Sequence, residues 1–215
     1  WFHRLWIRRW VELLMSLGAG RAASTRDYQV LSTTNITSTG SQNYTVPEGT
    51  VFVEIEMYGG GGGGGAGKVS SGRGGSSHLK GGGGGGGAYV RHKIHIAQLI
   101  KDAVINFTVG AGGAGGTDGG TSSATDGADG GDTTLNSITV GLDVTSLSGP
   151  AAGGGSNGHA GGNLNLGSQA GTASGGNITN TNGSVGVGHG QISGGGSAVA
   201  GGDGGDAGGP DGGDG

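Results

Sequence analysis

Alternating apolar and polar residues predict two neighbouring β-strands before the middle of the chain. Within residues 50–58 every second residue is apolar, and Glu54 and Glu56 fall between the apolar positions. This alternation is typical of a strand with one buried face. Residues 88–96 alternate in the same way and place Arg91 on the polar side. We expect the basic face of the second strand to pair with the two glutamates of the first across an antiparallel sheet.

A third strand and three glycine tracts complete this pattern. Residues 103–109 read AVINFTV, which is typical of a short buried strand. Glycine tract 59–67 follows the first strand, tract 81–87 precedes the second, and tract 110–120 follows the third. If neighbouring strands are antiparallel, all three tracts extend from the same end of the sheet. The sequence therefore predicts a β-structured base that carries a glycine-rich tip.

Glycine makes up 60 of the 215 residues, and only four of these glycines fall within the first 58 residues. Extended glycine forms a helix of three residues per turn, with a rise of about 3.1 Å per residue and no internal hydrogen bonds. Several such helices can hydrogen-bond to one another sideways, and only glycine lets backbones approach that closely. We therefore predict a mainly β protein in which a small antiparallel β-domain carries a polyglycine II helix bundle. Disordered low-complexity tracts are the alternative.

Residues 1–20 carry a different pattern, with apolar side chains at helical spacing. The spacing predicts an N-terminal amphipathic α-helix whose apolar face differs from its charged face. The residues of the apolar face are Trp6, Trp10, Leu13, Leu14 and Leu17. We interpret this helix as an assembly or docking interface, because the rest of the chain offers little core. Packing on its own domain and binding at a membrane surface are the alternatives.

Residues 62–68 match the spacing of a phosphate-binding loop, G-x-x-x-x-G-K, but their context does not fit one. Such a loop needs Ser or Thr after the Lys and a helix that begins there. Val69 stands at the Ser or Thr position, and the glycines that follow oppose a helix by about 1 kcal/mol each. The sequence therefore argues against a nucleotide site.

Charge divides the chain into a basic and an acidic part. Residues 1–101 carry all 11 Lys and Arg against five acidic residues, whereas residues 102–215 carry ten Asp and no Lys, Arg or Glu. An acidic glycine-rich region repels nucleic acid, so we expect no nucleic-acid partner. The chain contains no cysteine, which excludes a disulfide framework.

Catalytic and metal-binding motifs are not evident. The six histidines lack the spacing of metal ligands, and no nucleophile elbow is present. We therefore expect neither an enzyme nor a cofactor. The C-terminal stretch GGDGGDAGG partly matches a calcium-binding glycine-rich repeat. Calcium binding there is the alternative to a purely solubilising role for Asp203, Asp206, Asp211 and Asp214.

Three segments together resemble the glycine-rich domain of bacteriophage tail fibre and tail-tip proteins. They read YTVPEGTVFVEIEMYGGGGGGGAG, GGGGGGGAYVRHKIHI and INFTVGAGGAGGTDGGTSS, and the likeness covers roughly residues 43–132. The resemblance implies a structural or adhesive virion component, commonly a homotrimer. A similar glycine-rich segment occurs in the extracellular part of anaplastic lymphoma kinase receptors, but those are rich in cysteine and attached to a kinase.

The non-glycine insertions of the glycine-rich part are the candidates for contact with a host. They occupy residues 68–80, 156–160 and 177–184, where polar side chains could bind surface sugars or protein loops. The candidate receptor-contact residues are Lys68, Arg73, His78, Lys80, Asn157, His159, Asn177, Asn180 and Asn182.

These observations favour a phage tail fibre or tail-tip adhesin, located at the tip of a virion and extracellular. Its expected partners are other virion tail proteins and a host receptor, either a glycan or an outer-membrane protein. We divide the chain into an assembly helix (1–20), a linker with the first strands (21–58) and a glycine-rich domain with the distal tip (59–215). A purely structural fibre or head-decoration protein, or a secreted glycine-rich surface protein, are the alternatives.

Overall fold

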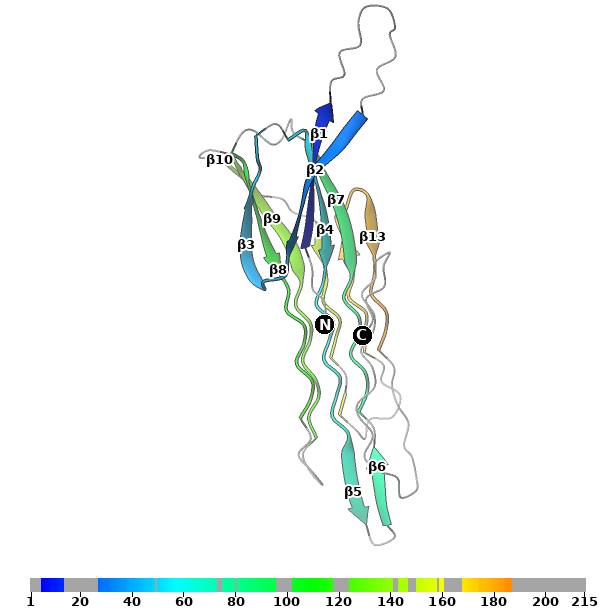
Figure 1. The fold of residues 1–215 in the computed structure, drawn as a ribbon. Helices are drawn as coiled ribbons and strands as arrows, with labels where there is room; N and C mark the ends of the chain where they lie inside the picture. The colour runs from blue at the N-terminus through cyan, green and yellow to red at the C-terminus, as the bar shows by residue number, and fades with distance from the viewer. Residues whose placement is uncertain are drawn as a thin grey trace, which may run out of the picture.

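The computed structural model describes most of the chain between residues 5 and 186 (Figure 1). The described ranges are 5–13, 27–48, 50–72, 75–79, 81–95, 102–117, 124–140, 143–146, 150–157, 159–160 and 168–186. Within them the protein is mainly β, every strand pair is antiparallel, and no α-helix is present.

Two sheets form the base of the molecule. The first sheet has the strand order β13 (Thr179–Thr181), β7 (Tyr89–His95), β4 (Phe52–Tyr58), β1 (Leu5–Leu13) and β2 (Asp27–Ile36). The second has the order β12 (Ala173–Ser174), β11 (Ala151–Ala152), β9 (Thr133–Val140), β8 (Val104–Val109) and β3 (Gly40–Thr45), and β10 (Asp143–Ser146) also pairs with β9. The three strands predicted from residues 50–58, 88–96 and 103–109 are confirmed as β4, β7 and β8.

The hydrophobic core lies between the two sheets. The first sheet contributes Val53, Ile55 and Val90, and the second contributes Ile105 and Phe107. These five side chains are at most 1% exposed. Because the apolar residues of β4 and β8 recur at every second position, each strand turns one continuous apolar face inward. The large side chains of the protein are thus concentrated in the base.

The outer face of β4 is also buried, which the alternation of apolar and polar residues did not predict. Glu54 is 5% exposed, and Arg91 of β7 donates to its Oε1 from Nε at 2.9 Å and from Nη2 at 2.5 Å. The register sets Arg91 directly opposite Glu56, yet its closest contact is the diagonal partner Glu54. The expected pairing of a basic strand face with these two glutamates is therefore confirmed.

The predicted N-terminal helix is not observed in the described residues, where residues 5–13 form β1. This strand lies between β2 and β4 and pairs with both, so its backbone groups are bonded within the sheet. The segment LWIRRWVEL is rich in Trp, Ile and Val, which favour strands. Its apolar residues also fit helical spacing, and pairing with the neighbouring strands selected the strand. Residues 1–4 and 14–20, the remainder of the predicted helix, lie outside the described residues.

Seven glycine-rich segments extend from one end of the two sheets as a long narrow bundle (Figure 1). We call it the glycine bundle, and its segments are 59–67, 81–88, 110–117, 124–132, 153–160 (except residue 158), 168–172 and 182–186. The predicted common exit of the glycine tracts is confirmed, but not from a single sheet: β8 lies in the second sheet, between β9 and β3, and not beside β4 or β7. The common exit follows from the antiparallel pairing of β4 with β7 and of β8 with β9.

A short hairpin lies at the far end of the glycine bundle. It consists of β5 (Lys68–Gly72) and β6 (Gly75–Leu79), which pair with each other. Figure 1 shows this hairpin at the opposite end of the molecule from the two sheets. The sequence identified these residues only as a non-glycine insertion, and the pairing into a hairpin was not predicted.

Candidate functional site

The segments of the glycine bundle are held together by backbone hydrogen bonds that recur at every third residue. The amides of Gly59, Gly62 and Gly65 donate to the carbonyls of residues 88, 85 and 82. The amides one residue further along, at residues 60, 63 and 66, donate instead to the carbonyls of residues 131, 128 and 125 in another segment. A repeat of three residues is the period of an extended polyproline-type helix. The prediction that the glycine tracts bond sideways to one another is confirmed.

Glycine is required in the bundle because neighbouring backbones lie too close for a side chain. A Cβ built on Gly62 would lie 2.1 Å from the carbonyl oxygen of Ser156, and one on Gly113 would lie 2.0 Å from that of Ala128. In the described residues, glycines with positive φ are Gly40 and Gly175, and both lie outside the bundle. Close approach, not an unusual backbone conformation, therefore explains the glycines of the bundle.

A row of aspartates closes one side of the bundle. The Oδ1 atoms of Asp126, Asp129 and Asp132 accept hydrogen bonds from the amides of residues 160, 157 and 154, at 2.5, 2.7 and 2.8 Å. The three aspartates are spaced by three residues, so they recur on one side of a three-residue-per-turn segment. Sequence reasoning missed this row, although the spacing in TDGADGGD was the available signal.

The glycines that matched a phosphate-binding loop are engaged within the bundle. The amides of Gly62, Gly63 and Gly65 each donate to a carbonyl of a neighbouring segment. Lys68 begins β5 instead of a helix. The backbone donors that a phosphate would need are thus already used.

Two of the candidate contact residues lie at the distal end. Lys68 is in β5 opposite Leu79, and His78 is in β6 opposite Val69. Arg73 and Lys80 lie outside the described residues.

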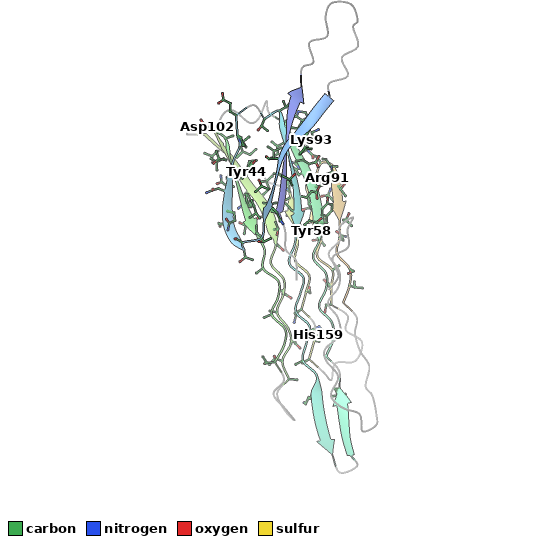
Figure 2. All side chains as sticks on the ribbon, viewed as in Figure 1. Tyr44, Tyr58, Arg91, Lys93, Asp102 and His159 are labelled. Atoms are coloured by element: carbon green, nitrogen blue, oxygen red, sulfur yellow. The ribbon has the colours of Figure 1, made fainter. Side chains whose placement is uncertain are left out.

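Two further candidates lie along the bundle, away from the hairpin. The amide of Asn157 donates to Asp129, and its carbonyl accepts a hydrogen bond from Ser168 Oγ at 2.6 Å. The Nδ1 of His159 lies 3.5 Å from Oδ2 of Asp126, and Figure 2 shows His159 partway along the glycine bundle.

The last three candidates lie in β13 or close to it in sequence, and their side chains hydrogen-bond to backbone groups. Asn177 accepts from the backbone amide of Lys93 and donates to its carbonyl, both at 2.8 Å. Asn180 makes the same two contacts with Gly176, and Asn182 accepts from the amide of Ala173. The structure therefore does not bring the candidate contact residues together at one tip.

Because residues 5–13 form a strand, the candidate assembly residues have different neighbours from those expected for a helix. Trp6 and Trp10 are register partners of Glu56 and Phe52 in β4. Leu13 is the last residue of β1 and is the register partner of Asp27 in β2. Leu14 and Leu17 lie outside the described residues. The role of these residues in assembly and the division of the chain into domains stay predictions.

The environment of His92 in β7 opposes its charged form. Burial lowers its pKa, and a hydrogen bond with the backbone of Gly175 partly offsets that effect. Its Nδ1 is the one buried side-chain polar atom in the described residues without a hydrogen-bond partner. Tyr89 in the same strand is buried too, and this raises the pKa of its hydroxyl.

The described residues contain no cluster of three or more His, Asp or Glu side chains arranged to hold a metal ion. Within the same described residues, no helix is long and apolar enough to cross a membrane. The aspartates considered for calcium, Asp203, Asp206, Asp211 and Asp214, lie outside the described residues.

Comparison with known protein families matches residues 36–215 to a family described as "Glycine-rich domain". No curated protein and no solved structure matches the chain. The matched region begins in β2 and includes the other strands of the base after it and the whole glycine bundle. On this match, which spans well over half of the sequence, the chain belongs to the glycine-rich domain family.

Proposed function

We propose that this protein is a phage tail fibre or tail-tip adhesin whose polyglycine II bundle acts as a spacer between the base and a host-contacting hairpin. The observation that carries the proposal is the position of β5 and β6 at the far end of the glycine bundle (Figure 1). A spacer of this kind gains stiffness from its lateral hydrogen bonds, because each segment is fixed to several others. The resemblance to tail fibre proteins supports the same role.

The β5–β6 hairpin is the proposed contact surface. Of the candidate segments, this one is farthest from the base, and its Lys68 and His78 offer hydrogen-bond donors to a glycan or a protein loop. Asn177, Asn180 and Asn182 are less suited, since their side chains already bond to the backbone nearby. The proposed partners are other virion tail proteins at the base and a host-surface receptor at the hairpin, in a homotrimeric assembly outside the cell.

Adsorption blocking tests the proposal. Purified protein added to host cells before infection should lower the rate of phage adsorption, because it occupies the receptor. A variant whose residues 69–78 are replaced by a two-residue Asn-Gly turn should lose this activity. The matched control is a Lys93→Ala variant, whose change lies in β7 of the base.

The two variants must first show that they remain folded, by circular dichroism and thermal melting. Blocking that persists without the hairpin would rule out β5–β6 as the contact surface. Protein that is present in purified virions but never blocks adsorption would instead favour the structural alternative. Absence from virions would favour a secreted surface protein.

A further inference from the structure

The outer face of the second sheet carries a regular array of uncharged polar side chains. Strands β3, β8 and β9 are neighbours in this sheet, at one side of the base (Figure 1). Core residues such as Ile105 and Phe107 face inward, so the residues that alternate with them face outward. We call nine of these outward residues the polar grid, because the strand register aligns them in three rows. The rows are Ser41–Thr108–Thr134, Asn43–Asn106–Ser137 and Thr45–Val104–Thr139.

The polar grid is neutral and open to solvent. All but one of its side chains are Ser, Thr or Asn, and none is charged. Ser41, Asn43 and Thr45 are exposed and the other six are partly exposed, so a partner can reach them from outside. Neighbouring positions of such a sheet lie about 4.8 Å apart across the strands and about 6.7 Å apart along them. The outer face of the first sheet differs, because it carries the ion pair of Arg91 with Glu54.

Hydrogen bonds between side chains leave hydroxyl hydrogens of the polar grid free to donate outward. The Nδ2 of Asn106 donates to Ser137 Oγ and to Thr139 Oγ1, both at 3.1 Å. The Nδ2 of Asn136, beside the grid, donates to Thr108 Oγ1 at 2.9 Å. These three hydroxyl groups act as acceptors, and among the described residues none of them donates a hydrogen bond. Each hydroxyl group therefore keeps its own hydrogen for a partner.

We propose that the polar grid is a binding surface for a neutral polysaccharide. Sugar hydroxyl groups are both donors and acceptors, and the hydroxyl and amide groups of the grid offer both functions in return. The bonds of Asn106 hold its neighbours in place before a ligand binds, which lowers the entropy cost of binding. Because similar groups recur across three strands, one polymer can make the same weak contact many times.

Other classes of ligand fit the polar grid less well. Nucleic acids and acidic polymers are bound through Lys and Arg, which are absent from the nine positions. Protein interfaces are enriched in aromatic residues, Met and Arg and depleted in Ser, which is the opposite of this composition. Small molecules are bound in concave sites, whereas the grid is a sheet face. The inference concerns the base and does not rest on the host contact proposed for the β5–β6 hairpin.

Depletion of the full chain from solution by insoluble cellulose, chitin or starch tests this inference. We expect at least one of these neutral polysaccharides to bind the protein, equally well at low and high salt. The double variant Thr108→Val with Thr139→Val removes two outward hydroxyl donors at nearly unchanged shape, so it should weaken binding about tenfold or more. The matched control is Thr181→Val, which makes the same change at an exposed position of β13 and should bind like the wild type.

The variant without the β5–β6 hairpin separates this inference from the proposed function, because it retains the polar grid and should still bind. Failure of the wild-type chain to bind any of the three polysaccharides would overturn the inference, and so would undiminished binding by the double variant. Binding that disappears with the hairpin or at high salt would likewise exclude the grid.

Nuclear magnetic resonance on the wild-type chain decides the question if the double variant does not fold. Soluble oligosaccharides from cellulose, chitin and starch are the probes. They should shift the amide signals of β8 and β9 and leave those of β13 unchanged. Shifts confined to other parts of the chain, or no shifts, would overturn the inference.

Discussion

The base and the glycine bundle are two parts of one chain that are stabilised in opposite ways. In the base, side chains such as Phe107 and Ile55 are removed from water between two sheets. In the bundle, the segments consist largely of glycine, and their amides and carbonyls bond from one segment to the next. The base thus depends on side chains that fill space, and the bundle depends on their absence. A substitution that is mild in one part is severe in the other.

The charged groups of the two parts also differ in their role. In the base, Arg91 pairs with the buried Glu54 across neighbouring strands. In the bundle, Asp126, Asp129 and Asp132 bond to backbone amides and need no cationic partner for that contact. The acidic character of the C-terminal half is therefore partly structural, in addition to any effect on solubility.

The largest expected effect comes from emptying the core of the base. Phe107 is 1% exposed and is the largest fully buried side chain described. Phe107→Ala should lower the free energy of unfolding by about 3–5 kcal/mol, because it leaves a cavity as well as losing apolar burial. Urea unfolding followed by tryptophan fluorescence measures this loss. A loss below about 1 kcal/mol would mean that the core contributes little to the stability of the chain.

The bundle should respond strongly to a single added methyl group. Gly62→Ala places a Cβ 2.1 Å from a backbone oxygen that cannot rotate away. We expect it to lower the free energy of unfolding by about 1–3 kcal/mol. The matched control is Gly115→Ala, which adds the same methyl group in open space and should stabilise the monomer by about 0.4–1 kcal/mol through the unfolded chain. Equal effects of the two substitutions on the melting temperature would contradict close packing of the segments.

The aspartate row should have a smaller effect, confined to the bundle. Asp129→Ala removes the acceptor of the amide of Asn157, at an exposed position. A cost of about 1 kcal/mol is expected, since water can partly replace the lost contact. Hydrogen exchange at the amide of residue 157 should become faster while exchange in β8 is unchanged. Asp129→Asn retains an acceptor oxygen and should restore most of the protection.

The smallest expected effect is the response of the base to mild acid. The pKa of His92 is lowered in the folded protein, chiefly by burial, whereas in the unfolded chain it has its ordinary value of about 6.5. The unfolded state therefore binds more protons as the pH falls through that value, and stability declines from there toward the folded pKa. Above about pH 6.5 the contribution of His92 to stability should not change with pH.

Thermal melting of the wild-type chain and of His92→Gln between pH 7.5 and 5.5 measures this difference. The wild-type chain should lose more of its melting temperature than the variant over that range. A parallel decline of both proteins would show that other groups carry the acid sensitivity.

The sequence by itself determined the parts of the fold that follow from local chemistry. The two-residue repeats around Ile55 and Phe107 fixed β4 and β8, because an alternating strand must bury its apolar face. The near-absence of side chains between residues 59 and 67 fixed the lateral bonding of the glycine segments, because their backbone groups need partners. The pairing of Arg91 with Glu54 and Glu56 was also predictable, because side chains of opposite charge fall on neighbouring strands.

Only the tertiary structure decided which segments became neighbours. Residues 5–13 satisfy both a helical and a strand periodicity, and the place between β2 and β4 made them a strand. Residues 68–79 carry no clear strand pattern in the sequence, but in the structure they form the paired strands β5 and β6. Asn177 and Asn180 were candidate contact residues in the sequence, but in the structure their side chains donate hydrogen bonds to backbone carbonyls. Contacts between residues distant in sequence depend on the packed arrangement, and no local pattern encodes them.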